Sequence, residues 1–434
     1  MGHRRAAASG NEWPETFLQT SKGNTNAMEK RMIDEVSGDT QAHFEPFGWH
    51  HWPDHPWMSY QFRRQLGETQ EGGGAISEVF RAASRMIPGD KESWHTEWLA
   101  VATRNHARGD AAEKAGHIQT AKNCWLRAVD YYRSAEFWLA GDDPRRLATF
   151  DKLEACSHKW GRYLTPPLEI VEIPYEDGGR LHAYFLRAPF AVEQQPVLIS
   201  FGGLDSFKDE MYFMTGRAAL QRGISMLMVD GPGQGATLRR DKVHTRHDYE
   251  VPVAACIDYL ETRSDVDLSR IAASGSSLGG YYMARAGCYE HRLAAVISHG
   301  AIWSVPELFE GAGDDHGLAL HICWSFGKPN MAEAMKKARD FTLEGHPQNM
   351  KCPYLIVHGG FDVLGVKAAT KVHDNAKAAG VDVTIRFIGE EETGADHCQH
   401  DNPTIGQEYM ADWLVDRFGI DEKAQLKQVL RPIF

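Results

Sequence analysis

The sequence contains few cysteines for its length, and their arrangement argues against two kinds of stabilising site. Seven cysteines are scattered over 434 residues without a Cys-x-x-Cys pair. A disulfide framework needs an even set of cysteines and a structural zinc site needs closely spaced ligands, so we expect neither. We also expect no bound metal and no organic cofactor. This cysteine usage favours a reducing cytoplasm as the compartment.

Positive charge and long apolar runs are also scarce. The 47 Lys and Arg residues are outnumbered by 59 Asp and Glu residues, and the net charge of -12 argues against nucleic acid or an anionic membrane as a partner. A transmembrane helix needs about 18 consecutive apolar residues, and we find no such run. Residues 1–26 lack the apolar segment of a signal peptide, so we expect a disordered N-terminus over 1–43.

The chain does have enough apolar material for a large core, because 42% of its residues are hydrophobic. Its length predicts one large domain with a second module. Residues 44–165 form the aromatic-rich part. At its start a metal could be bound by His50, His51, Asp54 and His55. However, Pro53 and Pro56 argue against a helix that would bring those ligands together. The alternative is an aromatic segment wedged between modules or over a pocket.

Helical periodicity begins near Gly74. Apolar residues recur at spacings of three and four, which predicts helices around 75–80, 94–101, 121–139 and 145–160. The tripeptide Arg108-Gly109-Asp110 is expected to separate two of these helices. Residues 44–165 are therefore either a bundle that packs on a neighbour or a cap over a catalytic face.

The period changes to two after Pro166-Pro167. An antiparallel hairpin is expected from 168–175 and 180–186. Continuous apolar strands then alternate with helices, at 196–201, 224–229, 270–274, 293–298, 354–357 and 383–388. Strands without polar alternation predict a mostly parallel sheet covered on both faces. A hairpin followed by this series is the order of an α/β-hydrolase core, expected over 166–302 and 351–434.

The strongest chemical signal is Gly275-Ser276-Ser277-Leu278-Gly279, directly after a predicted strand. In an α/β-hydrolase this Gly-x-Ser-x-Gly turn presents a nucleophilic serine, here Ser277, although an ordinary glycine-rich turn is the alternative. Asp362 and His397 each follow a later strand, in the chain order Ser, Asp, His. His397 would take the serine proton and Asp362 would orient the imidazole. His400 is the competing histidine.

An acyl-transfer site also needs two N–H donors for the oxyanion. One is expected from the backbone of Leu278, the residue after the serine, and the other from the loop after strand 196–201, at Gly203 or Leu204. The glycines of that loop could instead serve only to make a tight turn.

Several motifs together resemble one α/β-hydrolase group. They are Gly202-Gly203-Leu204-Asp205-Ser206-Phe207-Lys208-Asp209-Glu210, Asp230-Gly231-Pro232-Gly233-Gln234-Gly235, Gly275-Ser276-Ser277-Leu278-Gly279-Gly280-Tyr281 and Asp396-His397-Cys398. The group contains 2,6-dihydroxypseudooxynicotine hydrolase, fungal chain-shortening polyketide hydrolases and FrsA-like proteins. The resemblance implies cleavage of a carbon–carbon bond next to a ketone, with Ser277, Asp362 and His397 as a triad. It also implies a glutamate that protonates the departing carbon, at Glu307 or Glu310, and a homodimer through the helical region.

Residues 303–350 interrupt the strand and helix alternation and are expected to form a lid insertion. Trp303, Trp324 and Phe326 either line a substrate pocket under it or attach the lid to the core. Two further functions remain open. One is a carboxylesterase, lactonase or amidase that uses the same triad on an aromatic or hydrophobic small molecule. The other is a non-catalytic FrsA-like binding protein.

Overall fold

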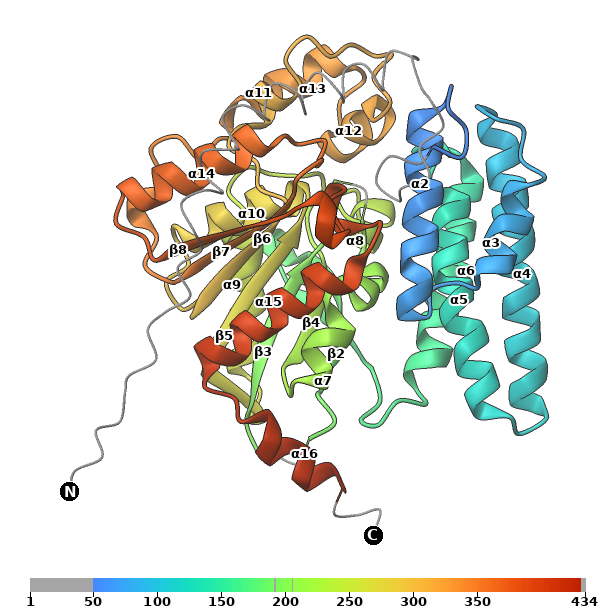
Figure 1. The fold of residues 1–434 in the computed structure, drawn as a ribbon, viewed down its shortest axis with the longest axis horizontal. Coiled ribbons are helices and arrows are strands. Elements are labelled where there is room, and N and C mark those ends of the chain that lie inside the picture. Colours follow the sequence, from blue (N-terminus) through green and yellow to red (C-terminus); the bar gives the residue numbers. More distant parts are fainter. Residues whose placement is uncertain (1–49, 191–192, 205, 431–434) are drawn as a thin grey trace.

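The centre of the molecule is an eight-stranded sheet, seen in a computed structural model that describes residues 50–190, 193–204 and 206–430 (Figure 1). The strand order is β1-β2-β4-β3-β5-β6-β7-β8. Only β2 runs antiparallel to its neighbours; the other pairings in the described sheet are parallel. The bounds are β1 Glu169–Pro174, β2 Arg180–Leu186, β3 Gln195–Phe201, β4 Ser225–Asp230, β5 Val266–Ser276, β6 Ala295–His299, β7 Tyr354–Gly359 and β8 Val383–Ile388. The predicted disordered segment 1–43 lies outside the described residues.

The sheet confirms the predicted fold class, and its strands lie close to the expected positions. The central strands β3, β4, β6 and β7 are buried throughout. Side chains alternate between the two faces of a strand, so a strand covered on both faces has no polar repeat. In β3, for example, Val197 and Ile199 pack into one core cluster and Leu198 packs into the other.

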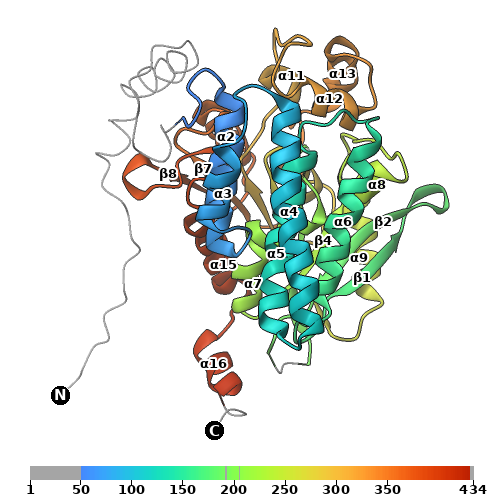
Figure 2. The same cartoon turned by 90° about the vertical axis from the view of Figure 1, so that its right-hand side faces the viewer.

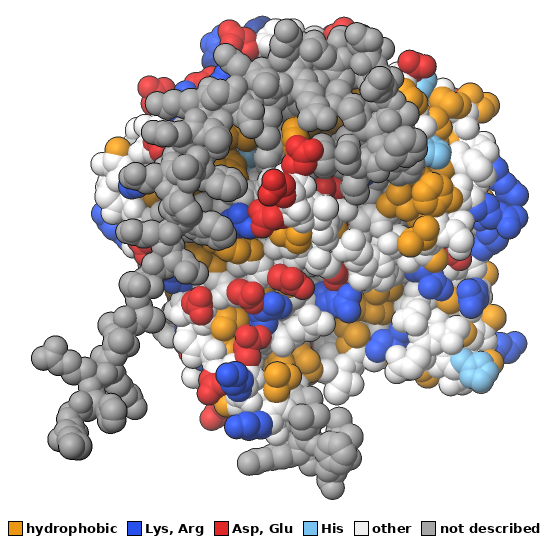
Figure 3. Space-filling view, viewed as in Figure 1, with side chains coloured by type: hydrophobic (Ala, Val, Ile, Leu, Met, Phe, Trp, Pro, Cys, Tyr) orange, Lys and Arg blue, Asp and Glu red, His pale blue; other side chains and the backbone are white. Residues whose placement is uncertain are grey.

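Helices cover both faces of the sheet. One face carries α9 (Glu250–Glu261), α10 (Leu278–Gly287) and α14 (Val366–Ala378), and the other carries α7 (Arg217–Gln221) and α15 (Pro403–Phe418). Two further helices are the short α8 (Gly235–Arg239) and the C-terminal α16 (Glu422–Leu430). On the face in Figure 3, acidic and basic side chains are interspersed. No helix in the described part of the chain is both long and apolar enough to cross a bilayer.

A helical layer precedes the sheet in the chain and stands beside it in space (Figures 1 and 2). It consists of α2 (Pro56–Gly67), α3 (Ile76–Ala83), α4 (Lys91–Lys114), α5 (Ile118–Glu136) and α6 (Pro144–Gly161). Its aromatic stripe is core: Trp94, Trp98 and Trp125 have no exposed surface and join the same apolar cluster as one face of the sheet.

The predicted break at Arg108-Gly109-Asp110 is wrong, because α4 continues through it. Gly109 faces the indole of Trp125, and a Cβ atom at this position would lie 2.6 Å from ring atoms. The glycine therefore serves close packing of α4 against α5 and does not end the helix.

A second helical group lies between β6 and β7 and covers the carboxyl edge of the sheet (Figure 1). It contains α11 (Val305–Leu308), α12 (Ala319–Phe326) and α13 (Met331–Lys337). Strands of a parallel sheet end together at this edge, so the residues that follow each strand are collected beneath these helices.

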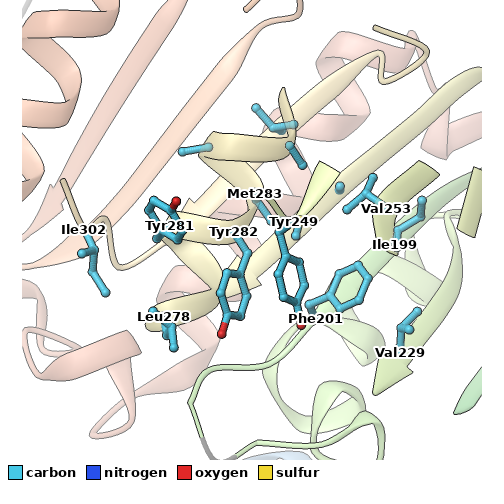
Figure 4. Packing of buried hydrophobic residues seen from close by; sticks show 14 of the residues in the cluster. Ile199, Phe201, Val229, Tyr249, Val253, Leu278, Tyr281, Tyr282, Met283 and Ile302 are labelled. Carbon is cyan, nitrogen blue, oxygen red and sulfur yellow. The ribbon is translucent and has the colours of Figure 1, made fainter. Parts of the chain in front are cut away.

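The core beside the start of α10 is rich in aromatic rings (Figure 4). Tyr249 from the start of α9 stacks on Tyr282 at 3.6 Å between ring centroids, and Phe201 at the end of β3 meets Tyr249 edge-on. The Tyr249 hydroxyl donates to the carbonyl oxygen of Pro232 at 3.1 Å. These contacts tie α10 to the start of α9 and to the end of β3, which matters because α10 begins directly after Ser277.

We expect Gly275→Ala to destabilise the protein by about 3 kcal/mol or more, because overpacking at a rigid position cannot relax. A Cβ atom on Gly275 would overlap the backbone carbonyl of Gly279 in the first turn of α10. The control is Gly389→Ala, where no atom lies within 4 Å of the added Cβ and φ is -90°. The control should change stability by less than about 0.5 kcal/mol. Urea denaturation measures both, and equal midpoints for the two variants would contradict the packing argument.

Candidate active site

Ser277 stands at the turn between β5 and α10, in a backbone conformation that a side chain rarely adopts. Its φ is 59° and its ψ is -120°. The Ser277 amide donates to the carbonyl oxygen of His299, at the end of β6, over 2.8 Å. A non-glycine residue persists in such a region only when its surroundings hold it there, and strained residues of this kind cluster at functional sites. The geometry matches a nucleophile elbow.

His397 and Asp362 meet at the same edge of the sheet. Asp362 lies just beyond β7, and its Oδ1 accepts a hydrogen bond from Nδ1 of His397 at 2.7 Å. The same oxygen accepts from the amide of Leu364 at 2.9 Å, and Asp362 is 1% exposed. Because Nδ1 is engaged with the carboxylate, Nε2 is the ring nitrogen that remains for chemistry.

The two groups shift each other's pKa in opposite directions. Burial alone would lower the pKa of His397, but the Asp362 carboxylate and the adjacent Cys398 hold it well above 6.5. Burial opposes the ionised form of Asp362, yet His397 and His358 together hold the pKa of its carboxyl well below the usual range. Asp362 is therefore a carboxylate at any working pH.

The competing histidine has a different environment. His400 Nδ1 lies 3.8 Å from Oε1 of Glu68, in the helical layer. Burial, followed by the charge of Arg64, lowers the pKa of His400 well below 6.5, so its ring stays neutral. Since the hydrogen bond to Asp362 belongs to His397, the geometry favours His397 over His400 as the base.

The three expected oxyanion-hole residues surround the serine. Gly203 comes directly after β3 and lies against the serine turn. A Cβ atom on Gly203 would lie 2.9 Å from Cβ of Ser277. Leu204 and Leu278 line the same cavity as Ser277 and His397. Leu278 opens α10, where backbone N–H groups have no partner within the helix and can bind an anion.

The lid forms the apolar wall of this cavity. Six of its side chains line the cavity: Val305, Leu308, Phe309, Leu318, Ile322 and Phe326. An apolar wall with a few polar groups near the reacting atoms is the usual form of a small-molecule site. Of the three predicted substrate-binding residues, only Phe326 lies here.

The predictions for Trp303 and Trp324 are corrected by their packing. Trp324 lies under the guanidinium of Arg146, with 3.9 Å from the ring centroid to Cζ, and near Arg239 at 5.0 Å. Its ring therefore joins the lid to the helical layer. Trp303 is 6% exposed, belongs to the core and lines a different cavity, with Lys371 over its ring. Both residues therefore fit the alternative stated above, in which these aromatic side chains attach the lid and do not line the substrate pocket.

The expectation for Glu307 is corrected as well. Its carboxylate accepts two hydrogen bonds from Nζ of Lys371, at 2.9 and 3.0 Å, and its side chain is 59% exposed. Glu307 lines the same separate cavity as Trp303, and Glu310 lines a third. Neither glutamate is among the described residues that surround Ser277, so neither is placed to protonate a substrate there.

Helix α2 supplies the polar wall that the sequence analysis missed. Trp57, Tyr60, Gln61 and Arg64 all line the cavity. Their spacing of i, i+3, i+4 and i+7 places them on one face of a helix. This spacing is visible in the sequence and could have indicated the helix. In the sequence, Pro53 and Pro56 argue against a helix here and favour an irregular aromatic segment. Pro56 in fact occupies the first turn of α2, where proline is tolerated.

The histidine cluster before α2 packs among aromatic rings. The ring of His51 lies 4.5 Å from Phe62 and 4.6 Å from Trp52, between centroids. Among the described residues, no group of three or more His, Cys, Asp or Glu side chains is arranged to hold a metal ion. From residue 50 onwards, the segment therefore fits the alternative of an aromatic segment and not that of a metal site.

Comparisons with known proteins bear on the family and the fold. The family model described as "Esterase FrsA-like" matches residues 86–311, and the model described as "Prolyl oligopeptidase family" matches residues 206–421. "Alpha/beta hydrolase xenA" of Xenoacremonium sinensis is 34% identical over 260 residues, and the match covers 58% of this chain and 61% of that relative. The chain thus spans less than two thirds of that relative.

A second relative matches over nearly its full length. "Hydrolase LUC6" of Fusarium sp is 30% identical over 406 residues, which cover 84% of this chain and 97% of the relative. The crystal structure of a 2,6-dihydroxy-pseudo-oxynicotine hydrolase is also similar, with a TM-score of 0.68 and 25% identity over 81% of this chain and 95% of that one. From the family match and the sheet that supports the serine turn, it follows that this chain belongs to the Esterase FrsA-like family and has the α/β-hydrolase fold.

Proposed function

We propose that this protein is a serine hydrolase that cleaves the carbon–carbon bond next to a ketone in an acyl or aryl ketone. The observation that carries the proposal is the 2.7 Å hydrogen bond from His397 to Asp362, beside a cavity that Ser277 also lines. The resemblance to a structure named as a 2,6-dihydroxy-pseudo-oxynicotine hydrolase adds support, as do relatives named as hydrolases.

The first half of the proposed reaction forms an acyl-enzyme. Ser277 Oγ attacks the ketone carbon and gives its proton to Nε2 of His397, while Asp362 stabilises the imidazolium. The carbonyl oxygen becomes an oxyanion, and the backbone N–H groups of Leu278 and of Gly203 or Leu204 donate to it.

Collapse of this intermediate breaks the carbon–carbon bond. The electron pair leaves with the departing carbon, which receives a proton from His397, and the acyl group stays on Ser277. Water then attacks the acyl-enzyme, with His397 as the base, and releases a carboxylic acid. The overall products are one carboxylic acid and one shorter ketone or arene.

The placement of Glu307 narrows the substrate class. Among the described residues that line the cavity there is no carboxylic acid, so His397 is the proton source in the proposal. An imidazolium is acidic enough to protonate a leaving carbon whose negative charge is shared with a neighbouring carbonyl, as in the cleavage of a β-diketone. We therefore place β-diketones with apolar acyl or aryl groups, which suit the lid wall, first among candidate substrates.

Hydrolysis of a carboxylic ester, lactone or amide is the second candidate function. The observation in its favour is the same lack of a carboxylic acid among the described lining residues. The leaving group of an ester is an alkoxide, and His397 protonates its oxygen directly. No further proton donor is therefore required.

We expect the wild-type protein to cleave benzoylacetone, and Ser277→Ala to lose at least about 1,000-fold in kcat, because the nucleophile is removed. Chromatography of the acid and ketone products measures both. The matched control is Glu307→Gln, which removes the exposed partner of Lys371 and should stay within about twofold of wild type.

The outcomes separate the alternatives. Hydrolysis of p-nitrophenyl butyrate without cleavage of any β-diketone would support the esterase alternative over the proposed reaction. A folded wild-type protein that acts on neither class would favour the non-catalytic binding protein. A large loss in Glu307→Gln would contradict the placement of that glutamate outside the site.

The raised pKa of His397 predicts the pH dependence. A general base must be neutral, so kcat/KM should rise as pH increases and its ascending limb should lie above pH 6.5. In Asp362→Asn the imidazolium loses its facing carboxylate, so the limb should move to lower pH, and kcat should fall by about 10,000-fold through loss of the correct tautomer. A pH profile of ester or diketone cleavage tests this. A wild-type limb below 6.5, or a limb that does not move in the variant, would contradict the assignment.

A further inference from the structure

Two side chains on the cavity face of α2, Tyr60 and Trp57, carry a polar group that no described residue hydrogen-bonds: the phenol hydroxyl and the indole N–H. Gln61 accepts a hydrogen bond from Arg133 at 2.8 Å, and Arg64 donates to Glu68 at 2.9 Å. Tyr60 lines the cavity with them, but among the described residues none forms a hydrogen bond with its hydroxyl. Tyr60 is partly buried, and a phenol hydroxyl that no described residue hydrogen-bonds can donate to a ligand in the cavity.

Tyr60 also stands next to the proposed base. Its ring centroid lies 6.4 Å from that of His397 and 6.1 Å from that of His400. The leaving group of the proposed reaction must lie against His397, because it takes its proton from that ring. The part of the cavity between His397 and α2 is therefore the leaving-group side, and Tyr60 borders it.

Cleavage of a β-diketone creates charge at a second position. The electron pair of the broken carbon–carbon bond is shared between the leaving carbon and the oxygen of the neighbouring carbonyl. The backbone donors near Ser277 serve the first carbonyl and not this enolate oxygen. A preorganised donor at a developing oxyanion contributes about 100- to 1,000-fold in rate.

We infer that the Tyr60 hydroxyl donates a hydrogen bond to the enolate oxygen of the leaving group, which makes this protein selective for substrates with a second carbonyl next to the leaving carbon. The inference rests on the proposed function. The proton that completes the ketone product still comes from His397, and Tyr60 keeps its own.

The surroundings of Tyr60 suit a donor. Burial, followed by the charges of Asp396 and Cys398, raises the pKa of the phenol well above 10, so it stays protonated across the working pH range. His400 beside it is neutral, and the guanidinium of Arg64, which acts to lower the pKa of the phenol, is paired with Glu68. Because no described residue bonds to the Tyr60 hydroxyl, its removal costs no hydrogen bond of the fold.

The test is Tyr60→Phe, assayed on benzoylacetone and on p-nitrophenyl butyrate. We expect kcat for the diketone to fall by about 100-fold and kcat for the ester to stay within about twofold, because only the diketone forms an enolate. The control is Tyr212→Phe, since Tyr212 packs on Trp160 at 4.6 Å and is not among the described lining residues. It should retain both activities.

A second measurement separates a donor from a packing role. When p-nitrobenzoylacetone is cleaved to acetic acid and p-nitroacetophenone, the leaving enolate is more stable than that of acetophenone. For formation of these products, the loss in Tyr60→Phe should therefore be smaller than for formation of acetic acid and acetophenone from benzoylacetone. An equal loss on diketone and ester, or an unchanged rate on the diketone, would overturn the role of Tyr60 while leaving the proposed function intact. A wild-type protein that hydrolyses the ester but no diketone would overturn the proposed function and this inference with it.

Discussion

The backbone of Ser277 is the constraint on which the candidate site depends. A φ of 59° is costly for a serine, and it is held by the 2.8 Å hydrogen bond from its amide to His299 and by close packing around the turn. Gly279 approaches the carbonyl oxygen of Gly202 so closely that a Cβ atom would lie 2.5 Å from it. The same packing brings Gly203 against the serine, so one arrangement of β3, β5 and α10 holds Ser277 at the cavity together with the proposed oxyanion donors.

The helical layer is part of the site, since α2 contributes to it in two ways. Its cavity face supplies Tyr60 and Arg64. On the neighbouring face, Arg63 donates to Oδ2 of Asp396 at 2.7 Å, and Oδ1 of that carboxylate accepts from the amide of His397 at 2.9 Å. Both charged side chains are nearly buried, where a pair is expensive to break. A displacement of α2 would therefore move both the cavity wall and the loop that carries the base.

Much of the site could be predicted from the sequence, because strand order determines which residues reach the carboxyl edge of a parallel sheet. This rule, together with the Gly-x-Ser-x-Gly motif, indicated Ser277 and Asp362. His397 was preferred over His400 only through the family resemblance. The positions of the lid side chains could not be predicted in this way, because a helix packed between two layers can direct an aromatic residue to either layer. Trp324 lies between arginines of α6 and α8, a contact between segments more than 80 residues apart in sequence. Gly109 is a similar case, since only the position of Trp125 explains it.

The central claim is that Ser277 is an activated nucleophile, and reaction with a fluorophosphonate tests it most directly. Such a reagent forms a stable covalent bond with a serine that a neighbouring histidine activates. The account predicts that intact-mass measurement shows one phosphonyl group per chain, and that peptide mapping places it on Ser277. A folded protein that remains unmodified, or a label on another residue, would contradict it.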